Sequence, residues 1–217
     1  AFLTALAGAS AQGLPAGRYG REALIAAFRQ AVTEGDRGRL EVAMSRAFVA
    51  FAGDLEAGAI DPKSVDRTIV REIDRPGAGQ LLAGLMGSDP WAFFAGLGPD
   101  APEYAHLMRE KFRLEAAIAA GGWGAKVPGT LKPGDTGVAA VALRDRLVAL
   151  GYLGHSAAGS FDRAMVRAVQ RYQADNGITP DGVVGEATLA ALNTPAEERL
   201  ESVVVALERL RWMGDTP

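Results

Sequence analysis

The most regular alternation of apolar and polar positions lies in the last third of the chain. One apolar stripe recurs at the spacing of a single helical face and consists of Ala140, Leu143, Leu147 and Leu150. Gly151 follows directly, where a left-handed C-terminal cap is expected. The pattern therefore predicts a helix that ends next to Gly151.

Two further helices are predicted after this one. A second stripe consists of Met165, Val169 and Tyr172. Asp162 stands at the helix start, where a carboxylate suits the exposed N–H groups, and Asn176-Gly177 can end the helix. Thr179–Gly182 has the composition of a turn, and Leu189 and Leu192 then mark a short third helix. Three short helices of this kind can share one small core.

The first 120 residues also show helical periodicity. The apolar stripes are Leu24, Ala27, Phe28 and Ala31, and then Leu40, Met44, Phe48, Phe51 and Leu55. Asp61-Pro62 and Asp89-Pro90 each place a capping acid before a proline, which predicts two short helices. A longer helix should follow Asp100 and end at Gly121-Gly122. Because no useful period-two alternation appears, the predicted fold class is all-α.

The N-terminal segment Ala1–Ala9 allows two interpretations. It could be the tail of a signal sequence that ends at Ala7-Gly8-Ala9, or it could be an amphipathic helix. A signal sequence has a basic segment before its apolar stretch, and none is present here. We therefore predict an amphipathic helix.

A last helix is predicted after Thr194, which can cap it, with Pro195 in its first turn. Its apolar stripe consists of Leu200, Val203, Val204, Leu207 and Leu210. We expect this stripe to return to the N-terminal helices and to cover Phe48, Phe51, Trp91, Phe93 and Phe94. The three-helix region would then be an insertion within one helical unit.

Composition narrows the class of protein. The 217 residues are 48% hydrophobic and 23% charged, which is typical of a globular chain. The net charge of −3 gives no basic field, so nucleic acid is not expected as a partner. No apolar stretch approaches the roughly 18 residues of a membrane-spanning helix. The chain has no cysteine, which excludes internal disulfides and thiolate nucleophiles without fixing the compartment.

The order of motifs adds a resemblance to known proteins. Four motifs follow one another: Leu131–Asp135, Phe161-Asp162, Tyr172-Gln173 and Asp181–Gly185. In this order they resemble a peptidoglycan-binding domain of the small three-helix type. The flanking motifs are Phe48–Phe51, Asp54-Leu55, Gly58, Asp61-Pro62, Gly121–Trp123, Val127-Pro128, Pro195, Glu198-Arg199 and Leu207–Trp212. With them, nearly the whole chain is similar to the large L,D-transpeptidases.

The resemblance implies three regions. Residues 1–126 would form a helical scaffold domain, and residues 127–194 a peptidoglycan-binding-like domain. Residues 195–217 would form the helix that returns to the scaffold and leads to a catalytic domain C-terminal to Pro217.

The chemistry of that family is not expected in this chain. In L,D-transpeptidases a separate β-rich domain carries a cysteine that attacks a peptide stem and a histidine that acts as base. The thiolate is the reactive form, so the two groups must lie together. Without cysteine, this chain should be inactive alone. His106 and His155 have no partner at metal-ligand spacing, so neither a metal nor a cofactor is predicted.

Seven residues are candidates for contact with peptidoglycan, and they are Trp123, Arg144, Arg171, Tyr172, Gln173, Asp181 and Thr188. The two rings suit sugar faces, and the amide, carboxylate and hydroxyl suit stem-peptide amides. The two arginines, with Arg146 and Arg167, match the carboxylates of peptide stems. Structural alternatives stay open, because Tyr172 completes a core stripe and Asp181 can bond within its own turn. A solvated helix face is the alternative for the arginines.

Three functions are consistent with these patterns. The first is the non-catalytic scaffold and peptidoglycan-binding portion of an L,D-transpeptidase, a transferase of cell-wall biogenesis. It would reside in the periplasm or cell envelope, after export by a signal sequence outside this chain. The alternatives are a free-standing cell-wall-binding protein and a helical protein-interaction scaffold without glycan binding. The apolar end at Arg211–Met213 favours the first function because it needs a partner surface.

Overall fold

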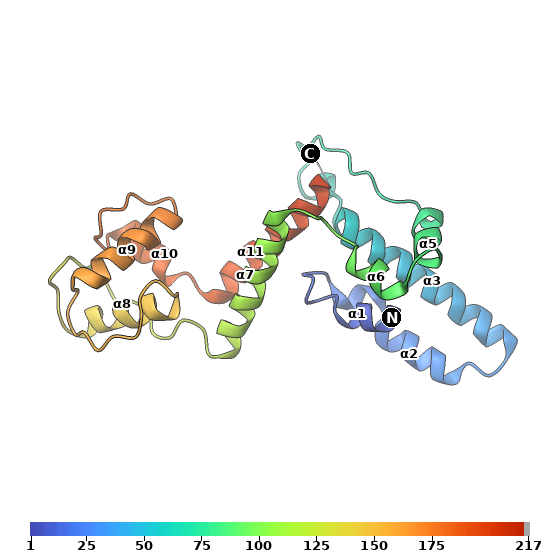
Figure 1. Ribbon diagram of the computed structural model, residues 1–217, viewed down its shortest axis with the longest axis horizontal. Coiled ribbons are helices and arrows are strands. Elements are labelled where there is room, and N and C mark those ends of the chain that lie inside the picture. Colours follow the sequence, from blue (N-terminus) through green and yellow to red (C-terminus); the bar gives the residue numbers. More distant parts are fainter. Residues whose placement is uncertain (215–217) are drawn as a thin grey trace. The chain divides into compact units, whose positions relative to one another are not determined.

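The computed structural model describes residues 1–214, and helices make up its regular structure (Figure 1). The helices are α1 (Phe2–Ala7), the 3-10 helix η1 (Ala16–Tyr19), α2 (Arg21–Gln30), α3 (Glu34–Ala57), α4 (Pro62–Val65), α5 (Ala78–Met86), α6 (Pro90–Ala95), α7 (Pro102–Ala119), α8 (Val138–Ala149), α9 (Arg163–Asp175), α10 (Glu186–Asn193) and α11 (Ala196–Met213). Residues 1–214 contain no β-strand, so the all-α prediction is confirmed.

The contacts divide the chain into two compact units. Unit 1 consists of Ala1–Phe112 together with the segment from Ser202 onward, and unit 2 consists of Arg113–Glu201. Both boundaries fall inside helices, the first in α7 and the second in α11. Each unit therefore contains part of both of these helices. None of the helices in residues 1–214 has the length and apolarity that crossing a membrane requires.

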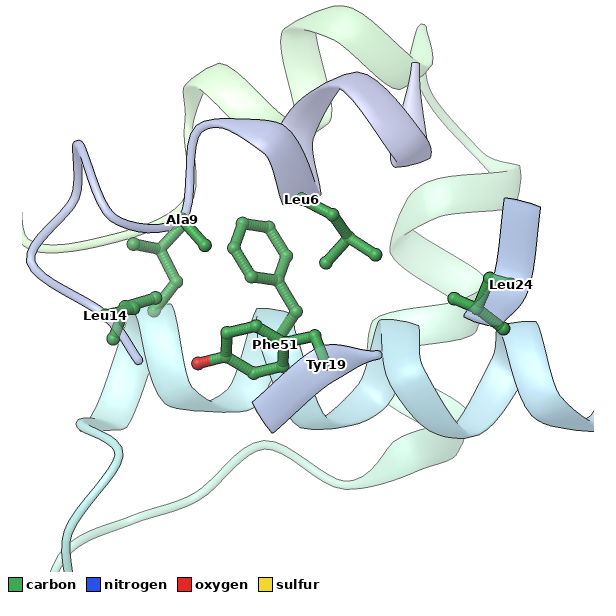
Figure 2. Packing of buried hydrophobic residues seen from close by; sticks show 7 residues of the cluster. Leu6, Ala9, Leu14, Tyr19, Leu24 and Phe51 are labelled. Atoms are coloured by element: carbon green, nitrogen blue, oxygen red, sulfur yellow. The ribbon is translucent and has the colours of Figure 1, made fainter. Parts of the chain in front are cut away.

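The core of unit 1 gathers around the rings of Tyr19 and Phe51, whose centroids lie 5.3 Å apart in an edge-on arrangement (Figure 2). Leu6 of α1 and Leu24 of α2 are buried in the same cluster. The short helix at the N-terminus thus buries one face, which confirms the amphipathic interpretation. The prediction for α2 was partly wrong, because Phe28 is 64% exposed.

A second group of aromatic side chains packs against the first helix, although the last helix was predicted to cover it. Phe48 and Phe94 both pack against the ring of Phe2, at centroid distances of 5.8 and 6.0 Å. Phe93 joins them at 5.9 Å from Phe48, whereas Trp91 is 58% exposed. The first helix therefore supplies the apolar partner that we had expected from the last one.

The C-terminal half of α11 makes polar contacts within unit 1. Arg211 is 1% exposed, and its guanidinium lies 3.4 Å from the carboxylate of Glu208. The same guanidinium donates to the hydroxyl of Tyr104 at 2.7 Å and to the carbonyl of Gln12. Since a buried charge is costly unless it is paired, this cluster fixes α11 against two distant segments of the unit.

Glu208, which pairs with Arg211, also contacts the segment that follows α3. Its Oε1 accepts hydrogen bonds from the backbone N–H of Ile60 at 2.7 Å and from the indole of Trp212 at 3.2 Å. Gly58 has a φ of +88°, and a Cβ added there would lie 2.6 Å from the Trp212 ring. Glycine is required at this position for both reasons.

A second buried carboxylate lies close to this cluster. Asp54 is 2% exposed, accepts from the hydroxyl of Tyr19 at 3.0 Å and pairs with Arg18 at 3.2 Å. Arg75 lies 3.6 Å away. Burial raises the pKa of Asp54, and its hydrogen bond with Tyr19 and the two arginines only partly offset that effect.

Unit 2 contains the predicted three-helix region, α8 to α10. The stripes are buried as predicted, at Ala140, Leu143, Leu147, Leu150, Met165, Val169, Tyr172 and Leu192. Asp162 caps α9 by accepting from the backbone N–H groups of Ala164 and Met165, both at 2.9 Å. Leu131, before α8, and Val184, between α9 and α10, form an isolated antiparallel bridge. The helix-by-helix prediction is confirmed here.

The segment before α8 is part of the fold of unit 2. Asn193 exchanges two hydrogen bonds with the backbone of Val127, both at 2.9 Å. The buried guanidinium of Arg146 donates to the carbonyls of Leu192 at 2.6 Å and Ala125 at 2.9 Å. These contacts hold the segment against α8 and the end of α10.

The predicted cap of the last helix was wrong. The hydroxyl of Thr194 donates back to the carbonyl of Ala190 at 3.2 Å, so it completes the end of α10. The last helix then begins at Ala196.

Candidate functional site

Gln173 is the centre of a polar network inside unit 2. Its Nε2 donates to Asp181 at 2.8 Å, to the carbonyl of Val183 at 2.9 Å and to the hydroxyl of Thr188 at 3.1 Å. Its Oε1 accepts from the backbone N–H of Gly182 at 2.9 Å. One amide therefore fixes the Asp-Gly turn to both α9 and α10, with its two Nε2 hydrogens shared among three acceptors.

Three of the predicted ligand contacts are buried in or beside this network. Tyr172 and Gln173 are each 1% exposed, and Thr188 is 2% exposed. Side chains buried to this extent offer almost no surface to a polymer outside the protein. These residues hold the core of unit 2 together.

Asp181 is exposed, but its carboxylate serves the turn. It accepts from the backbone N–H of Val183 at 2.8 Å as well as from Gln173. These two hydrogen bonds, the one from Val183 first, lower the pKa of Asp181. The carboxylate is thus held ionised as part of the loop that follows α9.

Trp123 is also buried, at 6% exposure, and the guanidinium of Arg113 lies over its ring at 5.4 Å. Its indole Nε1 has no hydrogen-bond partner among the described residues. The ring is therefore enclosed, and the prediction that it stacks on a sugar is not supported by its position.

The arginines of α8 differ from those of α9. Arg144 donates from Nη2 and Nε to Asp145, at 2.7 and 2.9 Å, and from Nη1 to the carbonyl of Ala158. Its charge is therefore neutralised locally. Arg146 is 2% exposed, and burial lowers its pKa. Arg167 lies exposed on α9.

Arg171 belongs to a group of side chains that we call the Tyr152 cluster, which consists of Tyr152, Arg171, Tyr172, Asp175 and Arg199. Arg171 donates to the carbonyl of Tyr152 at 2.5 Å. The hydroxyl of Tyr152 donates to Asp175 at 2.9 Å, and its ring meets the buried ring of Tyr172 edge-on at 5.2 Å. Burial, and then the bond to Asp175, raises the pKa of Tyr152 to about 12.

Arg199 completes the Tyr152 cluster from α11. Its guanidinium donates to the hydroxyl of Tyr172 at 2.7 Å and to the carbonyl of Ala191 at 2.9 Å. Within residues 1–214, neither Arg171 nor Arg199 has a carboxylate at ion-pair distance. The cluster therefore combines a partly exposed aromatic ring with two guanidinium groups that have no acidic partner there.

Sequence reasoning named Arg171 and Tyr172 but missed the rest of the cluster. Tyr152 follows the cap of α8, and Asp175 is the last residue of α9. Arg199 lies in the first turns of α11. No periodicity or motif connects these three positions, and only the packing of the helices brings them together.

The two histidines show no sign of a metal centre. His106 and His155 are both exposed. Among residues 1–214, no group of three or more histidine, aspartate or glutamate side chains is arranged to hold a metal ion.

Comparison with known families assigns both regions of the sequence. Residues 1–110, which are half of the 217 residues, match the family described as Scaffold domain. The chain belongs to that family. Residues 136–192 match the family described as "Putative peptidoglycan binding domain", and this match covers α8, α9 and all but the last residue of α10. No curated protein matches the chain.

Proposed function

We propose that this protein binds peptidoglycan through unit 2 and acts in the bacterial cell envelope. The match of residues 136–192 to a peptidoglycan-binding family carries the proposal. The three-helix core of α8 to α10 supports it, because the apolar stripes of the matched region are buried against one another. Arg171 offers a guanidinium for the stem carboxylates that peptidoglycan displays.

We further propose that the chain is the non-catalytic portion of an L,D-transpeptidase. Its membership of the Scaffold domain family, with a peptidoglycan-binding region after it, supports this role. Its task would be to hold the enzyme on its polymeric substrate in the periplasm, while a cysteine domain performs the acyl transfer. The coding sequence beyond Pro217 tests this part. A cysteine and histidine domain there supports the role, and a stop codon overturns it.

Sedimentation with purified sacculi tests the binding. The full chain should pellet with insoluble peptidoglycan at low salt, and the bound fraction should fall as salt is raised, because charged contacts at a surface are screened. A globular protein of similar size and charge is the control. Equal pelleting of the two proteins at low salt would overturn the proposal.

A further inference from the structure

We propose that the Tyr152 cluster is the ligand site of unit 2 and that it takes a sugar together with a carboxylate of the peptide stem attached to it. The ring of Tyr152 would lie against an apolar sugar face, and Arg171 and Arg199 would face the carboxylate. The inference rests on the proposed binding of peptidoglycan, and it names the surface and the chemical group that are recognised.

The balance of charge is the first argument. The hydrogen bonds of Arg171 and Arg199 go to two backbone carbonyls and one tyrosine hydroxyl, all of which are uncharged acceptors. A guanidinium has five N–H donors, so each arginine keeps donors for a ligand. Arg144 is different, because Asp145 already occupies its fork. An external carboxylate would find its complement at the Tyr152 cluster and not at Arg144.

The rigidity of the ring is the second argument. Tyr152 is held at its hydroxyl by Asp175, at its carbonyl by Arg171 and at its ring by Tyr172. The side chain nevertheless keeps part of its surface exposed. An aromatic side chain that is already ordered loses little entropy when a ligand packs on it, which favours binding.

The polar groups around the ring suit a saccharide. The carboxylate of Asp175 uses Oδ2 for Tyr152 and retains lone pairs for sugar hydroxyls. The guanidinium groups of Arg171 and Arg199 are positively charged and supply hydrogen-bond donors. Asp175 also repels an anionic ligand, so its charge should limit the affinity that the arginines provide.

A pair of charge reversals tests the site in the full chain. Arg171→Glu should lower the affinity for sacculi about ten-fold or more, because a carboxylate contact is replaced by repulsion. Arg163→Glu is the matched control, since Arg163 is exposed on the same helix. It lies eight residues earlier, about 12 Å along the helix axis. At about 0.15 M salt the control should change the affinity less than about two-fold.

Two further substitutions separate the ring from its hydroxyl. Tyr152→Phe keeps the stacking surface and should retain binding, whereas Tyr152→Ala should weaken it about five-fold or more. Asp175→Asn keeps an acceptor for Tyr152 but removes a negative charge, so it should strengthen binding. Thermal melting of each variant, followed by circular dichroism, shows whether the fold is intact.

Competition with soluble probes tests the chemical group. An N-acetylmuramyl dipeptide, which carries a carboxylate, should displace the protein from sacculi. A neutral chitooligosaccharide of N-acetylglucosamine should displace it much less. Equal displacement by both probes would overturn the role of the carboxylate.

The outcomes distinguish this inference from the proposed function. If the wild-type chain binds sacculi and Arg171→Glu and Arg163→Glu weaken binding equally, the attraction is diffuse and the Tyr152 cluster is not the site. The same conclusion follows if neither variant weakens binding. If the wild-type chain does not bind at low salt, the proposed function and the inference fall together.

Discussion

Both units bury an arginine side chain, but they neutralise it in different ways. In unit 1, Arg211 meets the carboxylate of Glu208. In unit 2, Arg146 meets only backbone carbonyls, from Leu192, Ala125 and Gly124. In unit 1 the acid and the arginine both come from α11, and each also bonds to another segment of the unit. Unit 2 instead uses the end of α10, where carbonyls carry the negative end of the helix dipole.

The difference bears on function. An arginine that is bound to carbonyls needs no acidic side chain, and the carboxylates of Asp162 and Asp181 in unit 2 accept instead from backbone N–H groups of a helix cap and a turn. The guanidinium groups of Arg171 and Arg199 at the Tyr152 cluster have no carboxylate at ion-pair distance within residues 1–214. In unit 1 the buried carboxylates Asp54 and Glu208 are both paired with arginine, which is the arrangement of a structural core.

Breaking the ion pair of unit 1 should have the largest effect on stability. Arg211→Met leaves the carboxylate of Glu208 without its cation, and removing one partner of a buried pair costs about 3–5 kcal/mol. Urea unfolding followed by circular dichroism measures the loss. The double variant Arg211→Met with Glu208→Gln should recover part of it, because the uncompensated charge is gone.

Arg209→Met is the control for this prediction. Arg209 lies on the same helix and is exposed, so its replacement should change the free energy of unfolding by less than about 0.5 kcal/mol. If Arg211→Met cost no more than the control, the buried ion pair would contribute nothing to the stability of unit 1.

Removing the amide of Gln173 should have the largest effect in unit 2. Gln173→Leu leaves the N–H of Gly182 and the carbonyl of Val183 without their partner, which should cost about 1–3 kcal/mol. The expected cost is smaller than for Arg211→Met because no charge is left uncompensated. Hydrogen exchange of the Gly182 amide, compared between wild type and variant, measures the local effect. Unchanged protection of that amide would contradict the network.

The smallest effects should appear in the pH dependence, where the two units differ in sign. Asp54 in unit 1 has a raised pKa, mainly because it is buried. Its contribution to stability is therefore present below its usual pKa near 3.8 and is lost as the pH rises through its folded pKa. Asp181 in unit 2 has a lowered pKa, mainly from the Val183 N–H bond. Its contribution is present above 3.8 and is lost as the pH falls through its folded pKa.

The two asparagine variants measure this contrast. The stability of wild type minus that of Asp54→Asn should fall as the pH rises above 3.8. The same difference for Asp181→Asn should instead rise as the pH rises toward 3.8 and then level off. Melting temperatures between about pH 3 and pH 7 are sufficient for the comparison. If both stability differences changed with pH in the same direction, burial would not be the main influence on the pKa of Asp54.

The stripes and caps of α8 to α10 were predicted from sequence because they depend on neighbours three and four residues away. Asp162 and the Asp-Gly turn at Gly182 are local signals of the same kind, and the structure confirms both. The same reasoning predicted an amphipathic first helix, and the structure buries its Leu6. In these cases backbone geometry alone decides which side chains share a surface.

The sequence by itself thus determined the helical class, the positions of most helices and the absence of a thiol nucleophile. Tertiary structure decided which polar side chains are accessible. Tyr172, Gln173 and Thr188 looked like ligand contacts, yet they are buried and hydrogen-bonded inside unit 2. The pairing of Arg211 with Gln12 and Tyr104, and the approach of Tyr152 to Asp175, join positions far apart in the sequence. Such contacts follow from the packing of whole helices, and no local pattern of residues encodes them.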